Sequence, residues 1–318
     1  MDLIDISQNF ATENQAREFL ESILWPDGPI CPHCGIVGEA YKLEARKKSK
    51  RPVREGVWKC RECAKQFTVT VGTIFEDSHI PLHKWLMAIH LMNASKKGVS
   101  AHQMHRMLGL GYRAAWFMCH RIRHALNDDA PPDKLGGTVE IDETYVGGKV
   151  KGHGVKAGKD NKAPVVSLVE RKGRVRSFHM EHVTAKNLRP IINEHLHGWS
   201  EVMTDEAVVY PYVLNRKVAS HDVVCHSKEE YVRHENGRSI HTNSVESFFA
   251  LIKRGVYGTF HHISKQHLHR YLSEFDFRYN ARDVTDGERT ERAIQSVRGK
   301  RLTYYETGQE GETSPMVG

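Results

Sequence analysis

The sequence predicts an α/β protein in which a small metal-binding ribbon and a helical module precede a larger α/β domain. Three observations lead to this prediction. Two Cys-x-x-Cys pairs stand in the first fifth of the chain, helical periodicity follows them, and strand-like segments begin after residue 136. The 318 residues are enough for two or three domains of ~100–200 residues each.

Composition argues against membrane and disordered proteins. Hydrophobic residues make up 39% of the chain and charged residues 27%, as in ordinary globular domains. No run of 18 or more apolar residues occurs, so we expect no membrane span. The first residues carry Asp2 and Asp5 and lack the basic start and apolar core of a signal peptide, so we expect a cytoplasmic protein.

The net charge is concentrated in one segment. Lys and Arg number 46 against 39 Asp and Glu, which gives a formal net charge of +7. Residues 42–61 hold nine Lys or Arg and two Glu, so this segment carries the whole excess. A neutral body with one basic segment predicts contact with a polyanion at a defined place. The candidate contacts are Lys47, Lys48, Lys50 and Arg51.

Four of the six cysteines form two matched pairs, Cys31-Pro-His-Cys34 and Cys60-Arg-Glu-Cys63. Two thiolates three positions apart can chelate one ion, and a second pair completes a tetrahedral site. Without an export signal, such pairs indicate a metal site rather than disulfides. We therefore expect one structural Zn²⁺ held by all four thiolates. The alternative, two redox pairs, needs a thioredoxin-like βαβ context that the sequence lacks.

The N-terminal elements are one helix and the ribbon. Residues 12–24 have Thr12 as a possible N-cap and apolar residues on one face, which predicts a short helix. We assign residues 1–25 to this helix and residues 26–76 to the ribbon. Within the ribbon, residues 58–74 show the alternation of a strand.

Residues 77–130 are expected to form a helix-turn-helix-like module. Helical patterns cover residues 81–93, begin again at Ser100 and cover residues 112–126, with Gly109-Leu110-Gly111 as the last turn. A glycine turn before a basic last helix favours helix-turn-helix, although a plain helical linker with a solvated basic face is the alternative. The basic residues of the last helix expected to contact DNA are Arg113, Arg121 and Arg123.

The rest of the chain combines strands and helices. Strands are predicted over residues 138–146, 163–170, 174–182, 201–204 and 221–226. Helices are predicted over residues 184–196, 243–254 and 265–280. Three consecutive strands, a helix and two further strands before C-terminal helices fit a ribonuclease-H-like layout. We assign residues 136–300 to this domain and residues 301–318 to a polar tail.

Three acidic residues of this domain stand out by their positions. Asp142 lies on the first strand, Asp205 ends a short strand, and Glu246 lies on the following helix. Glu246 and Lys253 are seven residues apart, which puts them ~20° from each other around the helix, and Asn243 lies near them. Each acid alone can be a cap or turn residue, but the three together on these elements indicate an acidic site.

Longer strings around these acids resemble the ISXO-like insertion-sequence transposases, a family of DDE-type enzymes with an N-terminal zinc ribbon. The resemblance runs from about Cys31 to Arg282 and includes the cysteine pairs. It is carried by the strings V-E-I-D-E-T-Y-V-G-G-K, T-D-E-A, H-T-N-S-V-E-S-F-F-A-L-I-K-R-G-V-Y-G-T-F-H-H-I-S and H-L-H-R-Y-L-S-E-F-D-F-R-Y-N-A-R.

The resemblance implies a ribonuclease-H-like catalytic domain that transposes its own element. It implies Asp142, Asp205 and Glu246 as the acidic triad and Lys253 as the basic residue two turns on. Some members of the family use Asn as the third residue, which makes Asn243 the alternative to Glu246. The expected catalytic cofactor is Mg²⁺ or Mn²⁺, since two such ions can serve both oxygens of a phosphodiester displacement.

The expected partners are the terminal inverted repeats of the element and the target DNA, with a homo-oligomer in the DNA complex and an association with the nucleoid. Two other functions remain open. The chain can be a DNA-binding protein that has lost catalysis, or a nuclease of the same fold that cleaves strands without joining them. The presence of all three acids and of Lys253 argues against the first.

The basic segment gives a testable prediction. Neutralising Lys47, Lys48, Lys50 and Arg51 together should weaken binding to every DNA sequence, because phosphate contacts are independent of sequence. The slope of log K against log salt should flatten by about 3–4, at ~0.9 per phosphate contact. Titrations at several salt concentrations measure this slope. An unchanged slope would show that the segment is only solvated.

Overall fold

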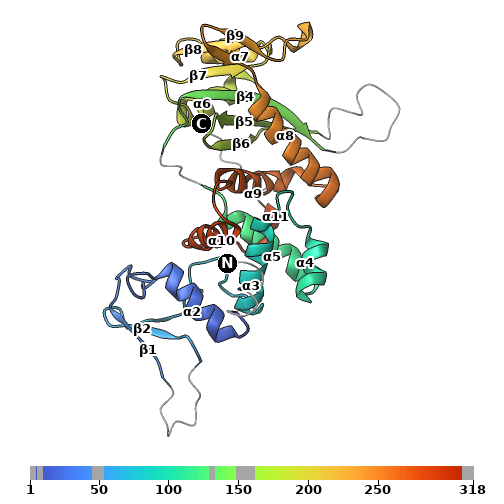
Figure 1. The fold of residues 1–318 in the computed structure, drawn as a ribbon. Helices are drawn as coiled ribbons and strands as arrows, with labels where there is room; N and C mark the ends of the chain where they lie inside the picture. The colour runs from blue at the N-terminus through green and yellow to red at the C-terminus, as the bar shows by residue number, and fades with distance from the viewer. Residues whose placement is uncertain (1–4, 6–9, 45–53, 129–132, 148–161, 310–318) are drawn as a thin grey trace. The chain divides into compact units, whose positions relative to one another are not determined.

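The computed structural model describes residues 5, 10–44, 54–128, 133–147 and 162–309 (Figure 1). The chain divides into two compact units. Unit 1 comprises Met1–Ser95, Val99–Leu126 and Val284–Gly318, and unit 2 comprises Lys96–Gly98 and Asn127–Asp283. In the described ranges, every helix falls short of the length or apolar character that crossing a bilayer requires.

Unit 1 begins with helix α2 (Glu13–Leu24) and a three-stranded antiparallel sheet. Thr12 caps α2 in a capping box with Gln15. The sheet has the order β1 (Ala40–Lys42), β2 (Trp58–Cys60), β3 (Gln66–Phe67). The strand predicted over residues 58–74 is two short strands in the structure, because a turn follows Cys60 and further backbone turns follow Phe67, with Val71 N–H donating to the Thr68 carbonyl.

The other described helices of unit 1 come from two separate parts of the chain. They are α3 (Leu82–Ala94), α4 (Ala101–Leu108), α5 (Tyr112–Ala125), α10 (Asp286–Gln295) and α11 (Tyr304–Gln309). Helix α4 ends at Gly109 in the left-handed region (φ 59°), and α4 and α5 pack against each other across the glycine turn. Helix α10 packs on α3 and α2, with His90 Nδ1 3.0 Å from Thr290 Oγ1. The expected domain end at residue 300 therefore differs from the structure, where unit 2 ends at Asp283.

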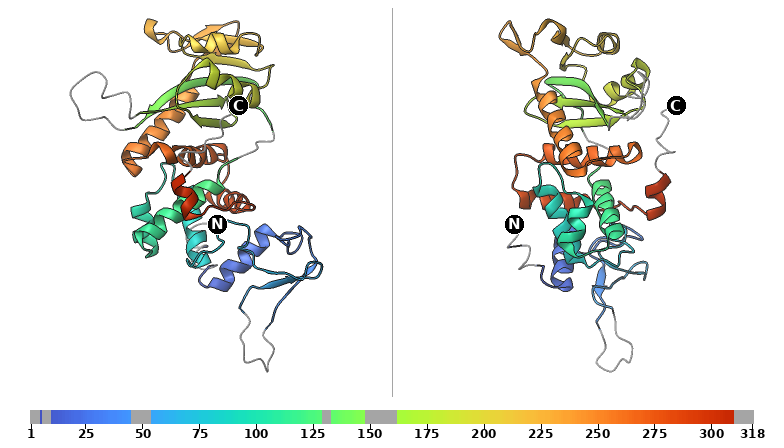
Figure 2. Two further views of the ribbon diagram at one scale, coloured as in Figure 1. Left: turned by 180° about the vertical axis from the view of Figure 1, so that it is seen from behind. Right: turned by 90° about the vertical axis from the view of Figure 1, so that its right-hand side faces the viewer.

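Unit 2 is built on a five-stranded mixed sheet (Figures 1 and 2). Its strands are β4 (Thr138–Val146), β5 (Ala163–Glu170), β6 (Val175–His179), β7 (Glu201–Thr204) and β8 (Ser220–Val223), in the spatial order β6-β5-β4-β7-β8. The first three strands pair antiparallel, and β4, β7 and β8 pair parallel. The mixed α/β class predicted from the sequence is confirmed.

Helices cover both faces of this sheet. One apolar core lies between the sheet and helices α6 (Ala185–His195) and α7 (Val209–Leu214), and a second lies between the sheet and helices α8 (Asn243–Gly255) and α9 (Leu268–Asn280). Side chains along a strand alternate between the two faces of the sheet. Val139 and Ile141 of β4 therefore lie in the first core, and Val146 lies in the second. The central strands are consequently buried on both sides.

Helix α9 also closes the outer edge of the sheet. The Asn280 amide of α9 accepts from Val175 N–H at 2.7 Å and donates to the Val175 carbonyl at 3.0 Å. One helical turn earlier, Asp276 accepts from the backbone and hydroxyl of Ser177, both at 2.7 Å. These contacts satisfy the free edge of β6, which removes a site for strand addition.

A β-hairpin separates the last sheet strand from α8. It consists of β9 (Arg233–Glu235) and β10 (Arg238–Ile240), and its turn residues Asn236 and Gly237 both have positive φ (49° and 74°). The short elements η1 (His226–Lys228), η2 (Val256–Phe260) and η3 (Lys265–His267) complete unit 2. This hairpin, α7 and α10 were not predicted from the sequence, although Asn-Gly is a strong hairpin signal.

Candidate active site

The parallel pairing of β4 and β7 brings two of the predicted acids together. Thr138 pairs with Glu201 and Glu140 pairs with Met203. Two residues further along this register, Asp142 comes opposite Asp205, which follows the last residue of β7. One carboxylate oxygen from each of Asp142, Glu143 and Asp205 lies within 4.8 Å of the other two. Glu143 was not among the predicted site residues.

Burial and neighbouring charges raise the pKa values of Asp142 and Glu143 in this acidic cluster. Burial, and after it the nearby charges of Asp205, Glu143 and Glu246, raise the pKa of Asp142 to about 7 against the opposing hydrogen bond from the Glu143 backbone N–H. Burial also raises the pKa of Glu143, which accepts a hydrogen bond from the Tyr210 hydroxyl. Three carboxylates this close repel one another, and divalent cations with oxygen preference would relieve that repulsion. The donor set therefore fits a divalent metal site.

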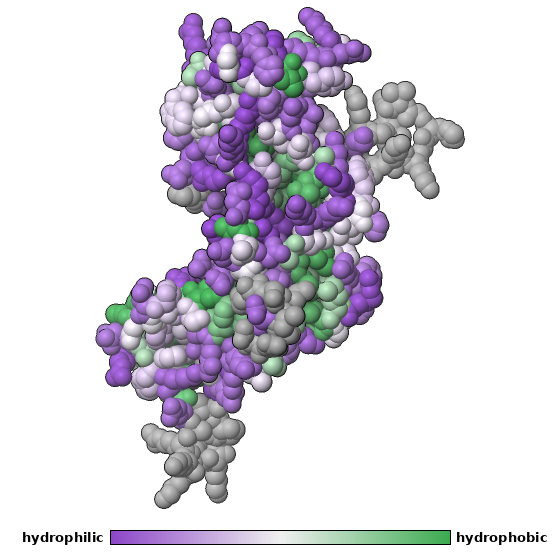
Figure 3. Space-filling model, viewed as in Figure 1, coloured by the Kyte–Doolittle hydropathy of each residue, from purple (hydrophilic) through white to green (hydrophobic). Residues whose placement is uncertain are grey.

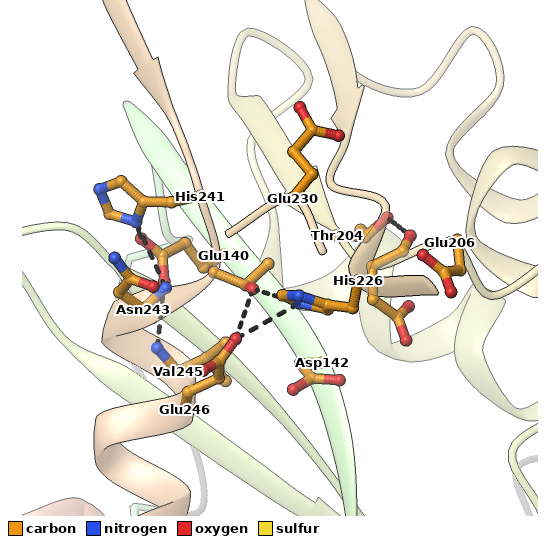
Figure 4. A network of polar contacts seen from close by, with 12 residues as sticks. Glu140, Asp142, Thr204, Glu206, His226, Glu230, His241, Asn243, Val245 and Glu246 are labelled. Atoms are coloured by element: carbon orange, nitrogen blue, oxygen red, sulfur yellow. Dashed lines mark hydrogen bonds and ion pairs between the residues drawn. The ribbon is translucent and has the colours of Figure 1, made fainter. Parts of the chain in front are cut away.

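Glu246 faces the same part of the site from helix α8 (Figure 4). Its carboxylate oxygen Oε1 accepts from the Thr242 hydroxyl at 2.9 Å and lies 3.4 Å from His226 Nε2. Its side chain is 46% exposed, so it keeps access to solvent and to a ligand. Its charge contributes to the raised pKa of Asp142, and Figure 4 shows the two side chains facing the same space, although Glu246 is not one of the three acids grouped within 4.8 Å.

The other predicted residues of α8 are exposed. Asn243 is exposed at the first position of the helix, and its backbone N–H lies 3.3 Å from His241 Nδ1. Lys253 is exposed two turns after Glu246. The spacing keeps the side chains of Glu246 and Lys253 on one side of the helix.

The four paired cysteines converge in unit 1. The Sγ atoms of Cys31 and Cys63 are 3.6 Å apart, those of Cys34 and Cys60 are 3.7 Å apart, and all four lie within 4.8 Å of one another. A tetrahedral site with Zn–S bonds of ~2.3 Å separates its sulfurs by ~3.8 Å. Burial raises the pKa of Cys31, but backbone hydrogen bonds from His33 and Cys34 outweigh it and lower that pKa to about 7.

Comparison with known proteins identifies the family. The family described as "ISXO2-like transposase domain" matches residues 134–280, and that described as "Transposase zinc-ribbon domain" matches residues 11–66. The chain carries an ISXO2-like transposase domain behind a transposase zinc-ribbon domain. It is also 26% identical over 292 residues to an "Uncharacterized protein in transposable element ISH50" of Halobacterium salinarum, an alignment that covers 85% of this chain and 92% of that protein.

The two matches coincide with the two candidate metal sites of the transposase. The transposase-domain match contains the acidic cluster, Glu246 and Lys253. The zinc-ribbon match contains all four cysteines. The helices α3 to α5 lie outside both matches, so the proposed role of this module rests on its own structure.

The predicted DNA contacts of the transposase divide into three groups. Arg113 is exposed on α5 and remains a candidate DNA contact. Arg121 and Arg123 are only 5% and 1% exposed, which argues against phosphate contact. The Arg121 guanidinium instead donates to the Glu76 carbonyl at 2.6 Å, and its burial lowers its pKa to about 10. The residues Lys47, Lys48, Lys50 and Arg51 lie outside the described residues.

The prediction that Arg121 and Arg123 of α5 contact DNA disagrees with their burial, and the reason is packing. Helix α5 packs against α3 and α4, and Phe117 and Trp116 also contact the ring of Tyr304 from the C-terminal segment. The sequence contains no periodic signal for this third packing partner, since Tyr304 lies 187 positions after Phe117. Arg121 then lies over the rings of Trp85 and Phe117, both at 5.4 Å.

Metal analysis can test the ribbon. We predict about one zinc per chain in protein purified without chelator, because four thiolates complete a closed tetrahedral site. Cys60→Ser should lose the metal and unfold the ribbon at a lower temperature. Cys225→Ser, a cysteine of unit 2, is the matched control and should keep full zinc. Retention of full zinc by Cys60→Ser would exclude this ligand set.

The raised pKa of Asp142 predicts a pH-dependent stability. The folded state binds the proton of Asp142 more tightly than the unfolded chain, so stability is present at low pH and is lost as the pH rises through about 7. Asp142→Asn should therefore raise the Tm of the protein in magnesium-free buffer at pH 8 by about 2–4 °C. The gain should shrink toward pH 5.

Differential scanning calorimetry at both pH values measures this effect. Glu181→Gln, an exposed acid of unit 2, is the control and should leave the Tm unchanged at either pH. An equal gain from Asp142→Asn at pH 5 and pH 8 would contradict the electrostatic origin. Added Mg²⁺ should stabilise the wild type more than the variant, because the cation binds the charged cluster.

Proposed function

We propose that this transposase cleaves DNA strands at the ends of its element and transfers them to target DNA. The observation that carries the proposal is the convergence of Asp142 and Asp205, from two parallel strands, with Glu246 beside them. The sheet order β6-β5-β4-β7-β8 supports a ribonuclease-H-like fold for unit 2. Metal-dependent phosphoryl transfer needs neighbouring carboxylates that can hold divalent cations, and this sheet brings such carboxylates together.

The acidic residues would hold the catalytic metal. We propose Asp142, Asp205 and Glu246 as the ligands and Mg²⁺ or Mn²⁺ as the ions. When bound, such ions stabilise the attacking and leaving oxygens of an in-line displacement. Water would first break the phosphodiester bond and free a 3′-hydroxyl, which would then attack a target phosphodiester. Lys253 would hold a phosphate as a point charge.

Unit 1 would bind the terminal repeats. Zn²⁺ would fold the ribbon around its four cysteines, and the α4–turn–α5 arrangement fits a helix-turn-helix that presents Arg113 to DNA. The surface of unit 2 over β8, the β9–β10 hairpin and α7 is mostly hydrophilic (Figure 3), as expected where a polyanion is handled in water. We expect the DNA complex to contain more than one copy of the chain.

A plasmid assay separates the possible functions. A supercoiled plasmid that carries the element ends is incubated with the protein and Mg²⁺ or Mn²⁺. Joined products are the expected result. Cleaved products alone would indicate a nuclease, and specific end binding without products would indicate a DNA-binding protein without catalysis.

The variants Asp142→Asn and Asp205→Asn test the first two proposed ligands. Either substitution removes a charge that the cations need, so cleavage should fall by at least about 10³-fold while binding to element ends is retained. Gel-shift and cleavage assays on the same DNA measure both properties. Glu194→Gln, an acid whose side chain is 73% exposed, is the control and should cleave normally.

The third ligand is tested separately. A carboxylate offsets the charge of two cations better than a neutral amide, so Glu246→Gln should be inactive with Mg²⁺ and Asn243→Ala should stay active. The reverse result would make Asn243 the third ligand. Glu143→Gln completes the set, because Glu143 lies in the acidic cluster but already accepts from Tyr210.

A further inference from the structure

A carboxylate from a distant strand caps the first turn of helix α8. Glu140 of β4 is 0% exposed, and its Oε2 accepts from the backbone N–H groups of Ser244 at 2.7 Å and Val245 at 3.1 Å. Its Oε1 accepts from the Ser244 hydroxyl at 3.0 Å. These are the unpaired amides at the positive end of the helix, where a carboxylate is favourable.

Arg171 neutralises the buried carboxylate and extends the contact. Its Nε donates to Glu140 Oε1 at 2.6 Å, and its other nitrogens donate to the carbonyls of Ser239 at 2.6 Å and His241 at 2.8 Å. The guanidinium thus joins β4 to the end of the hairpin and to the segment that leads into α8. His241 Nδ1 lies 3.2 Å from the same Glu140 oxygen.

This arrangement leaves the natural cap residue of α8 available for another contact. Thr242 stands at the N-cap position, where its hydroxyl would usually accept from the first turn. Because Glu140 binds those amides, the Thr242 hydroxyl instead donates to Glu246 Oε1 at 2.9 Å. The capping contact therefore lies within one helical turn of Glu246.

Glu140 also lies close to the other acids along the sheet. It is two residues before Asp142 on β4, so both side chains leave the same face of the strand. The α8 amides bind one of these side chains, and Glu246, one turn into α8, faces the other (Figure 4). The spacing between Asp142 and Glu246 is consequently set through the Glu140 contacts.

We propose that Glu140, held by Arg171, is a positioning residue that fixes helix α8 so that Glu246 can share a divalent cation with Asp142. This inference rests on the proposed function. It assigns no direct metal contact to Glu140, whose oxygens are taken by the helix and by Arg171. Replacing residues that orient metal ligands typically costs about 10–100-fold in metal affinity or activity.

The first test compares Glu140→Gln with Glu201→Gln, an acid of the neighbouring strand β7 that is 3.7 Å from Arg238. The measured quantity is the Mg²⁺ concentration for half-maximal cleavage of element-end DNA. We expect it to rise by about 10-fold or more in Glu140→Gln, since the misplaced Glu246 binds the cation less tightly, and to stay unchanged in Glu201→Gln. Loss of folded protein alone would lower the amount of product without changing this concentration.

The double variant Glu140→Gln, Arg171→Met repeats the measurement in a protein that we expect to fold better than Glu140→Gln. Removing both charges of a buried pair is usually tolerated better than removing one. We expect circular dichroism and zinc content like those of the wild type, together with the same raised Mg²⁺ requirement. A wild-type Mg²⁺ requirement in this double variant would overturn the inference.

Mn²⁺ binding in the absence of DNA completes the test. Titration followed by the electron paramagnetic resonance of the free ion gives affinities for the wild type, Glu140→Gln, Glu246→Gln and the combined variant. If Glu140 acts through Glu246, Glu140→Gln should have no further effect when Glu246 is already Gln. Additive losses would overturn the inference, whereas failure of the wild type to cleave DNA would overturn the proposed function instead.

Discussion

Strand β4 pairs antiparallel with β5 and parallel with β7, and this double pairing determines where its acidic side chains lie. The parallel register brings Asp142 opposite Asp205, although the two residues are far apart in the sequence. Helices on both faces bury the strand, so its polar side chains must find partners inside the protein. The candidate site depends on how three neighbouring acids of this one strand meet that requirement.

Glu140, Asp142 and Glu143 meet this need for partners in different ways. Glu140 is fully buried but has five hydrogen-bonding or ionic contacts, from Arg171, His241 and the start of α8. Glu143 accepts from Tyr210. Asp142 is partly buried near other carboxylates, and burial together with their charges raises its pKa to about 7. Glu140 and Glu143 have partners, so the unfavourable repulsion is confined to Asp142. This is expected at a site where a bound cation supplies the missing positive charge.

The local patterns of the sequence predicted the sheet well. Strands β4, β5 and β7 have the predicted bounds, and the matched cysteine pairs converge as expected. Alternation also put Glu140 and Asp142 on one face of β4. What the sequence did not predict depends on contacts between distant segments: the burial of Arg121 and Arg123, the packing of α10 on α3, and the pairing of Glu140 with Arg171. Propensity and periodicity carry no information about such partners.

The two candidate metal sites follow the same principle with different chemistry. In each, the fold brings like-charged or ionisable groups together at a cost that a cation can offset. Thiolates from two tight turns suit Zn²⁺ and close its coordination with four ligands, which serves folding. Carboxylates from β4, the end of β7 and α8 suit ions that keep water in their coordination shell, which would serve the proposed phosphoryl transfer. The thiolates come from short turns about 30 residues apart, whereas the carboxylates need a complete sheet and a correctly placed helix. The precise placement of α8 is therefore the demanding part of this fold, and a buried, charge-neutralised carboxylate at its N-terminus provides a rigid means of achieving it.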